Sequence, residues 1–131
     1  MNPVNEQLSY PDHTILIAED DEANFQYFQQ TAKAAGIKIL RAENGLDAIK
    51  QCENHPEIKL ILMDGMMPVM TGYEASRKIR MIRPELPIVI LTAFVSQDSI
   101  RDAVLSGCND YLAKPIGAEE LRMVLKKWLV S

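Results

Sequence analysis

The stretch Leu60-Ile61-Leu62-Met63-Asp64-Gly65-Met66-Met67-Pro68 decides the fold of this chain. Four large apolar residues in a row, followed by turn-forming residues, are typical of a buried strand in a parallel sheet. The same pattern occurs at Ile15-Leu16-Ile17-Ala18, which is followed by Glu19-Asp20-Asp21-Glu22. Open α/β sheets carry their functional residues at the carboxyl ends of the strands. We therefore expect the acids after these two strands to share one pocket, where charge repulsion calls for a bound cation.

Strand and helix patterns alternate along the rest of the sequence. Short apolar runs predict strands at residues 15–18, 37–40, 58–63, 88–91 and 109–113. Apolar residues spaced three and four apart predict helices at residues 25–35, 46–53 and 97–106, after a capping box at 71–74, and around Leu121, Leu125 and Trp128. Five strand–helix pairs in strict alternation predict an α/β fold, with a doubly wound five-stranded parallel sheet and helices on both of its faces.

The size and composition of the chain exclude several classes of protein. A chain of 131 residues predicts one domain, which we place at residues 14–131, with residues 1–13 as a tail or linker. A net charge of −4 argues against a nucleic-acid partner held by charge alone. No apolar stretch approaches the roughly 20 residues of a membrane span, so we expect no membrane contact by this domain. Cys52 and Cys108 lack metal-ligand or redox spacing, which is typical of reduced cysteines in a cytoplasmic protein.

The polar residues at the predicted strand ends form a chemically coherent set. In chain order they are Glu19-Asp20, Asp64, Thr92 and Lys114. The three acids offer the hard oxygen ligands that Mg²⁺ prefers, and a cation there would neutralise an incoming phosphoryl group. The Thr92 hydroxyl could donate a hydrogen bond to a phosphoryl oxygen, and the Lys114 ammonium could pair with another. Asp64 would then be the nucleophile that forms an acyl phosphate.

These motifs resemble those of the receiver domains of two-component response regulators and hybrid histidine kinases. The resemblance spans nearly the whole chain, and all its motifs occur in the right order and spacing. It rests on residues 15–21, 62–72, 91–93 and 110–115. It implies a flavodoxin-like sheet with strand order 2-1-3-4-5. It also implies that the partner is a histidine kinase or a histidine phosphotransfer domain.

The resemblance further implies a role for each acid of the site. Asp64 would accept the phosphoryl group from a phosphohistidine. Asp20, Asp64 and the main-chain carbonyl of Met66 would bind Mg²⁺, and Glu19 would act mainly through metal-bound water.

The remaining site residues would read out the phosphorylated state. Thr92 and Tyr111 would be a switch pair, in which the hydroxyl moves toward the phosphoryl group and the ring turns inward. This change would alter the face made by the fourth helix, the fifth strand and the fifth helix. Lys114 would bridge to Asp64 or its phosphate, and its bond to Pro115 would be cis.

Two positions near the phosphoacceptor carry side chains that cannot hydrogen-bond to water. In this family, the side chains two residues after the phosphoacceptor and two after the switch threonine flank the path of the hydrolytic water. Here they are Met66 and Phe94, neither of which can orient a water molecule. We therefore expect slow loss of phosphate from the isolated domain.

Three other classes of protein fit these residues less well than a phosphoacceptor receiver. A phosphatase of the haloacid dehalogenase type would need a second acid at Met66, and a nucleotide-binding module would need a glycine-rich loop where Glu19 to Glu22 stand. A receiver that acts without phosphorylation would lack one of the acids, the threonine or the lysine. The domain is not expected to be a conventional enzyme, although a parent chain could be a histidine kinase. We favour a hybrid-kinase or phosphorelay origin over a stand-alone regulator, and the oligomeric state stays open.

Overall fold

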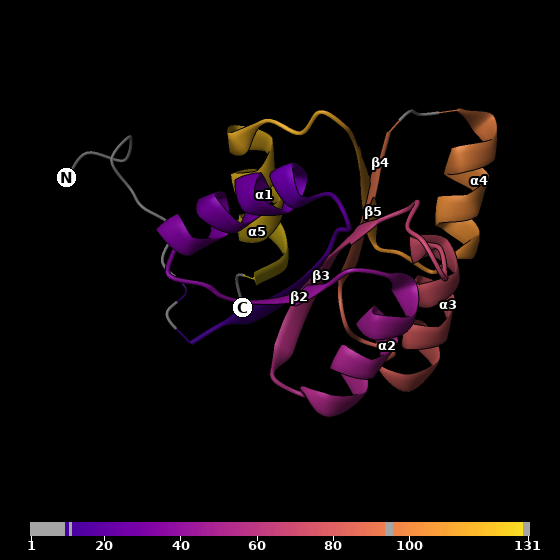
Figure 1. The fold of residues 1–131 in the computed structure, drawn as a ribbon, viewed down its shortest axis with the longest axis horizontal. Coiled ribbons are helices and arrows are strands. Elements are labelled where there is room, and N and C mark those ends of the chain that lie inside the picture. The colour runs from indigo at the N-terminus through magenta and orange to yellow at the C-terminus, as the bar shows by residue number, and fades with distance from the viewer. Residues whose placement is uncertain (1–9, 11, 94–95, 130–131) are drawn as a thin grey trace.

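The computed structural model describes residues 10, 12–93 and 96–129. Within these residues, five parallel strands form one sheet in the order β2-β1-β3-β4-β5 (Figure 1). The strands are β1 (Thr14–Ala18), β2 (Lys38–Ala42), β3 (Ile58–Asp64), β4 (Ile88–Thr92) and β5 (Asp110–Ala113). The architecture confirms the α/β prediction and the strand order implied by the resemblance.

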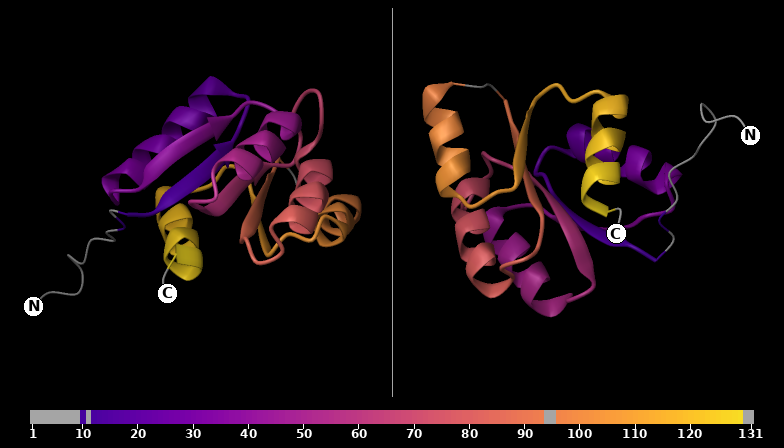
Figure 2. Two further views of the ribbon diagram at one scale, coloured as in Figure 1. Left: turned by 90° about the horizontal axis from the view of Figure 1, so that it is seen from below. Right: turned by 180° about the vertical axis from the view of Figure 1, so that it is seen from behind.

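Helices cover both faces of the sheet. They are α1 (Glu22–Ala34), α2 (Gly45–Asn54), α3 (Gly72–Ile82), α4 (Gln97–Leu105) and α5 (Ala118–Leu129). Helices α1 and α5 lie on one face, while α2, α3 and α4 lie on the other (Figures 1 and 2).

The core is divided by the sheet into two layers. Because successive side chains of a strand point to opposite faces, Ile15 and Ile17 pack with α1 and α5, whereas Leu16 and Ala18 pack with α2 and α3. Both faces of the central strands are covered, which explains why the strand sequences are continuously apolar rather than alternating.

Short polar contacts set where the helices begin. The Asp21 side chain accepts a hydrogen bond of 2.8 Å from the backbone N–H of Asn24 and so caps α1. Thr71 and Glu74 form the predicted capping box at the start of α3. The first cap lies beside the acids that follow β1, whereas α3 begins after the loop that follows Asp64.

The second strand is shifted relative to its prediction. It covers Lys38–Ala42 rather than residues 37–40. The backbone N–H of Ile37 donates to the carbonyl of Ala32 and closes α1, so pairing with β1 begins only at Lys38. Tyr10, which we had assigned to the tail, is buried, and its N–H donates to the Ala35 carbonyl. The neighbouring residues 1–9 and 11 lie outside the described part of the chain.

Candidate functional site

The register of the sheet brings the polar strand ends to one edge. Ala18 pairs with Met63, and Asp64 pairs with Leu91. Thr92 pairs with Ala113, the residue before Lys114. The residues that follow or end these strands therefore lie side by side, although they are far apart in the sequence.

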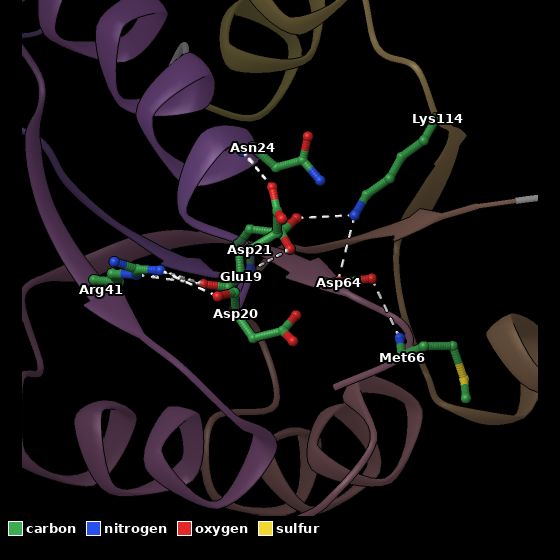
Figure 3. A network of polar contacts seen from close by, with 8 residues as sticks. All are labelled: Glu19, Asp20, Asp21, Asn24, Arg41, Asp64, Met66 and Lys114. Atoms are coloured by element: carbon green, nitrogen blue, oxygen red, sulfur yellow. Dashed lines mark hydrogen bonds and ion pairs between the residues drawn. The ribbon is translucent and has the colours of Figure 1, made fainter. Parts of the chain in front are cut away.

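Three carboxylates meet at this edge. Oxygen atoms of Glu19, Asp20 and Asp64 all lie within 4.8 Å of one another. Glu19 is 1% exposed and Asp64 is 7% exposed, whereas Asp20 is open to solvent. Figure 3 shows Asp64 facing the β1–α1 connection that carries the other two acids. The acidic pocket predicted from the sequence is thus formed.

Lys114 lies between two of the acids. Its Nζ is 2.9 Å from Glu19 Oε1 and 3.3 Å from Asp64 Oδ2 (Figure 3). Burial alone would lower the pKa of the Lys114 ammonium, but the hydrogen bond to Glu19 and the charge of Asp64 outweigh burial and raise it. The bond between Lys114 and Pro115 is cis, as expected. The lysine is therefore a charged partner of the site.

Glu19 is the most perturbed acid of the cluster. Burial raises the pKa of its carboxyl from 4.5 to about 7, the hydrogen bond from Lys114 opposes this rise, and the charge of Asp64 adds to it. Its Oε2 also accepts a hydrogen bond of 3.2 Å from the backbone N–H of Asp21. Both oxygens of this carboxylate are thus held within the protein.

The donor set suits a hard divalent cation. Carboxylate oxygens that are this close and partly shielded from water repel one another, and a cation such as Mg²⁺ relieves that repulsion. Asp64 Oδ1 accepts a hydrogen bond of 3.2 Å from the backbone N–H of Met66, which fixes the direction of the carboxylate. The exposed carboxylate of Asp20 gives such an ion access from solvent.

Two glycines close the loop between β3 and α3, a feature that the sequence analysis missed. The backbone N–H of Gly72 donates to the carbonyl of Gly65 at 2.9 Å. A Cβ on Gly72 would overlap the carbonyl oxygen of Asp64, and a Cβ on Gly65 would overlap the ring of Tyr73. At Gly72 only glycine allows this close approach to the main chain, so this residue keeps the loop tight beside Asp64.

Arg41, at the end of β2, was also missed. Its guanidinium donates to the main-chain carbonyl of Glu19 from both Nε, at 3.3 Å, and Nη2, at 3.2 Å. The only signal in the sequence was that Arg41 directly follows the predicted strand 37–40, which by itself does not identify a partner.

Thr92 and Tyr111 occupy different environments. Thr92 ends β4 and is buried, whereas Tyr111 on β5 is 36% exposed. Met66, one of the two residues expected to flank the water path, is 66% exposed. The other, Phe94, lies outside the described residues.

A pocket of about 520 Å³ opens beside Lys114. It lies between the first turns of α1 and the segment that joins β5 to α5. Its lining is formed by Asn24, Tyr27, Phe28, Ala93, Lys114, Pro115 and Ile116. The acidic site is thus flanked by a largely apolar hollow on the surface of α1.

Comparison with known proteins gives consistent results. A family model described as the response regulator receiver domain matches residues 15–126. The sensor histidine kinase GacS of Pseudomonas protegens is 35% identical over 128 residues, which is 94% of this chain and 14% of that protein. Eight curated relatives are 32–37% identical, and the chain spans only 3–29% of their lengths.

Two solved structures are informative about sites and partners. The receiver domain of the sensor histidine kinase PA1611 from Pseudomonas aeruginosa PAO1 has a magnesium ion coordinated in its active site cleft. It is 33% identical with a TM-score of 0.84, over 91% of this chain and 98% of that one. The receiver domain of Ssk1 from Saccharomyces cerevisiae was solved with the histidine phosphotransfer protein Ypd1. That match is 33% identical with a TM-score of 0.83, over 91% of this chain and 90% of that one.

Among the described residues, no helix has the length and apolar character that crossing a bilayer requires. The family model covers β1 from Ile15 onward, the other four strands in full and most of α5. With its strand order and its matched residues established, the chain belongs to the response regulator receiver domain family of two-component systems.

Proposed function

We propose that Asp64 accepts a phosphoryl group from the phosphohistidine of a histidine kinase or a histidine phosphotransfer domain. The observation that carries this proposal is the position of Asp64, at the end of a buried strand with two acids and Lys114 around it. A carboxylate oxygen of Asp64 would form the new bond to phosphorus, and the phosphorus–nitrogen bond to the donor imidazole would break. The bonding electrons would remain with the imidazole.

The residues around Asp64 fit a magnesium-dependent transfer. Asp20, Asp64 and the main-chain carbonyl of Met66 would hold Mg²⁺, with Glu19 acting through bound water. A bound Mg²⁺ would supply charge neutralisation at the transferring phosphoryl group. Support comes from the cluster of carboxylates within 4.8 Å and from the magnesium ion in the cleft of the PA1611 receiver domain.

Lys114 and Thr92 would contact the phosphoryl oxygens. The Lys114 ammonium already pairs with Asp64 at 3.3 Å and needs only a small movement to pair with an oxygen of the phosphoryl group. Thr92 ends the adjacent strand β4, and its hydroxyl would donate a hydrogen bond to a second phosphoryl oxygen. These contacts form only after transfer, so they would stabilise the phosphorylated state.

The donor would approach over the carboxyl edge of the sheet. The pocket beside Lys114, the partner of Asp64, is lined in part by Tyr27, Phe28 and Ile116. The complex of the Ssk1 receiver domain with Ypd1 supports a histidine phosphotransfer domain as one such donor. Similarity to sensor kinases supports a place for residues 14–131 as the receiver of a hybrid kinase, and a stand-alone regulator is the second candidate.

The first experiment tests the phosphoacceptor. The domain is incubated with Mg²⁺ and a small acyl phosphate, and its intact mass is measured. Wild type and Asp98→Asn, which changes an exposed acid of α4, should gain one phosphoryl group, whereas Asp64→Asn should gain none. Uptake by Asp64→Asn would place the phosphoacceptor elsewhere, and no uptake by wild type would favour a receiver that acts without phosphorylation.

The second experiment tests the metal site. A ligand that binds only the folded state stabilises it by RT ln(1 + [L]/Kd), about 2.7 kcal/mol at a concentration of about 100 Kd. Mg²⁺ should raise the melting temperature of wild type, and Asp20→Asn should remove most of this rise. An equal rise in Asp20→Asn would mean that the ion binds at another site.

The third experiment concerns the response to phosphorylation. We propose that the contact of Thr92 with the phosphoryl group lets Tyr111 turn inward, which repacks the face made by α4, β5 and α5. This face carries the exposed apolar side chains of Val104, Leu105 and Met123. Amide exchange should change in α4 and β5 when a phosphate mimic and Mg²⁺ bind. Changes confined to α2 would contradict this part of the proposal.

A further inference from the structure

Arg41 approaches the acidic site from the side opposite to Lys114. Figure 3 shows its guanidinium against the main chain of Glu19 and Asp20, while Lys114 and Asp64 lie across the site. We propose that Arg41 is a positioning residue, which holds the β1–α1 connection so that the Asp20 carboxylate faces Asp64 ready to bind a metal ion. This inference rests on the magnesium site proposed above.

The contacts of Arg41 are directed at the main chain of the acids. Nε and Nη2 both donate to the Glu19 carbonyl, at 3.3 and 3.2 Å, and Nη2 lies 3.5 Å from the Asp20 carbonyl. Nη1 forms an ion pair of 2.7 Å with Glu22 on the first turn of α1. One guanidinium thus joins β2, the connection after β1 and the start of α1. Arg41 contacts the main-chain carbonyls of Glu19 and Asp20 and does not occupy the carboxylate oxygens of either residue.

Asp20 is the acid that needs this support. The Glu19 carboxylate is held through its side chain by Lys114 and by the N–H of Asp21. Among the described residues, no hydrogen bond to the Asp20 carboxylate is formed, and the residue is exposed to solvent. The direction of this carboxylate is therefore set by its backbone, and Arg41 is the side chain that binds that backbone on both sides of Asp20.

The site requires an arginine rather than any cation. The face of the guanidinium lies 4.3 Å from the centroid of the Phe25 ring, and the side chain is 22% exposed. The planar guanidinium over the ring donates hydrogen bonds to three acceptors: the carbonyls of Glu19 and Asp20 and the carboxylate of Glu22. A lysine at this position would retain the charge, but its single ammonium cannot reach the two carbonyls and Glu22 in the same geometry.

Charge and positioning make opposite predictions for metal binding. Removing a positive charge next to three carboxylates would, by electrostatics alone, strengthen the binding of Mg²⁺. Removing the support of the Asp20 backbone would weaken it, because the ligand must then be ordered when the ion binds. The sign of the change in affinity therefore separates the two effects.

The experiment measures the dissociation constant of Mg²⁺ by calorimetric titration of the unphosphorylated domain, together with its melting temperature without metal. Arg41→Met retains an unbranched side chain without the guanidinium and should weaken Mg²⁺ binding about tenfold, the lower end of the effect of residues that orient metal ligands. Arg41→Lys retains the charge and should also weaken binding, by a smaller factor. Glu22→Gln breaks the ion pair but spares the carbonyl contacts, so its affinity should stay near that of wild type.

The outcomes distinguish this inference from the proposed function. Unchanged or tighter binding in both Arg41 variants, with only a lower melting temperature, would leave Arg41 a purely structural role and overturn the inference. Weaker binding in Glu22→Gln equal to that in Arg41→Met would assign the effect to α1 rather than to the carbonyl contacts. Absence of Mg²⁺ binding by wild type would overturn both the metal site and the role of Arg41. If Arg41→Met fails to fold, Arg41→Lys decides the question.

Discussion

Replacing Glu19 by Gln should change how the stability of the metal-free domain depends on pH. In the folded protein, burial raises the pKa of the Glu19 carboxyl from its ordinary value of 4.5 to about 7. The folded state therefore retains a proton on Glu19 between these pH values, whereas the unfolded chain has lost it. Stability from this group is complete below pH 4.5 and is lost as the pH rises to about 7.

The magnitude follows from the size of the pKa change. One pKa unit corresponds to about 1.4 kcal/mol, so a rise from 4.5 to about 7 corresponds to roughly 3 kcal/mol. Lys114 stays protonated in both states over this range and contributes no slope of its own. The free energy of unfolding of wild type, measured relative to that of Glu19→Gln, should thus fall by roughly 3 kcal/mol between these pH values.

Urea denaturation in the presence of a chelator measures this difference at a series of pH values. The comparison with Glu19→Gln removes the contributions of the titrating groups that do not interact with Glu19, which the two proteins share. Glu53→Gln, which changes an exposed acid of α2, is the matched control and should run parallel to wild type. A flat difference between wild type and Glu19→Gln would refute the reasoning, because it would mean that Glu19 titrates alike in the folded and unfolded chains.

Three further changes test other parts of the structure. Val69, in the loop before α3, has a φ of 70°, a value that a β-branched residue rarely adopts. Val69→Asn should raise the free energy of unfolding in urea by about 1 kcal/mol, and a decrease would show that the backbone at Val69 is not strained. The Ser76 hydroxyl is buried without a hydrogen-bond partner among the described residues. Ser76→Ala should stabilise the fold by up to about 1 kcal/mol, and a marked loss of stability would mean that the hydroxyl does form a hydrogen bond. Met66 cannot orient water, so Met66→Asn should shorten the half-life of the phosphorylated state, about tenfold for each 1.4 kcal/mol of barrier removed. Met66→Leu is the control, and equal half-lives of Met66→Asn and wild type would show that residue 66 does not control the hydrolytic water.

The elements of the fold were predictable because they depend on local patterns. Continuous apolar runs predicted β1, β3 and β4, shorter apolar segments predicted β2 and β5, and the alternation of strands with helices predicted a parallel sheet covered on both faces. The capping box at Thr71 and Glu74 was also read correctly, since capping involves residues only three positions apart. The bounds of β2 were missed, because Ile37 has the side chain of a strand residue while its N–H closes α1.

The sequence by itself determined which chemical groups this protein has and at which strand ends they stand. Glu19, Asp20 and Asp64 could be selected because they follow or end buried strands, and Lys114 because it follows the last strand; parallel strands present these ends at a common edge. Their assigned roles remain predictions, but the structure brings all four groups together.

Only the tertiary structure decided how these groups are held and charged. The raised pKa of Glu19 arises from its burial between strands, and burial depends on every element packed around it. The hydrogen bonds from Arg41 to the Glu19 carbonyl join β2 to the connection after β1, and the close contact of Gly72 with Asp64 depends on how the loop after β3 folds back. Such contacts leave no periodic trace along the chain, because they depend on distances between main-chain atoms that exist only once the sheet has formed.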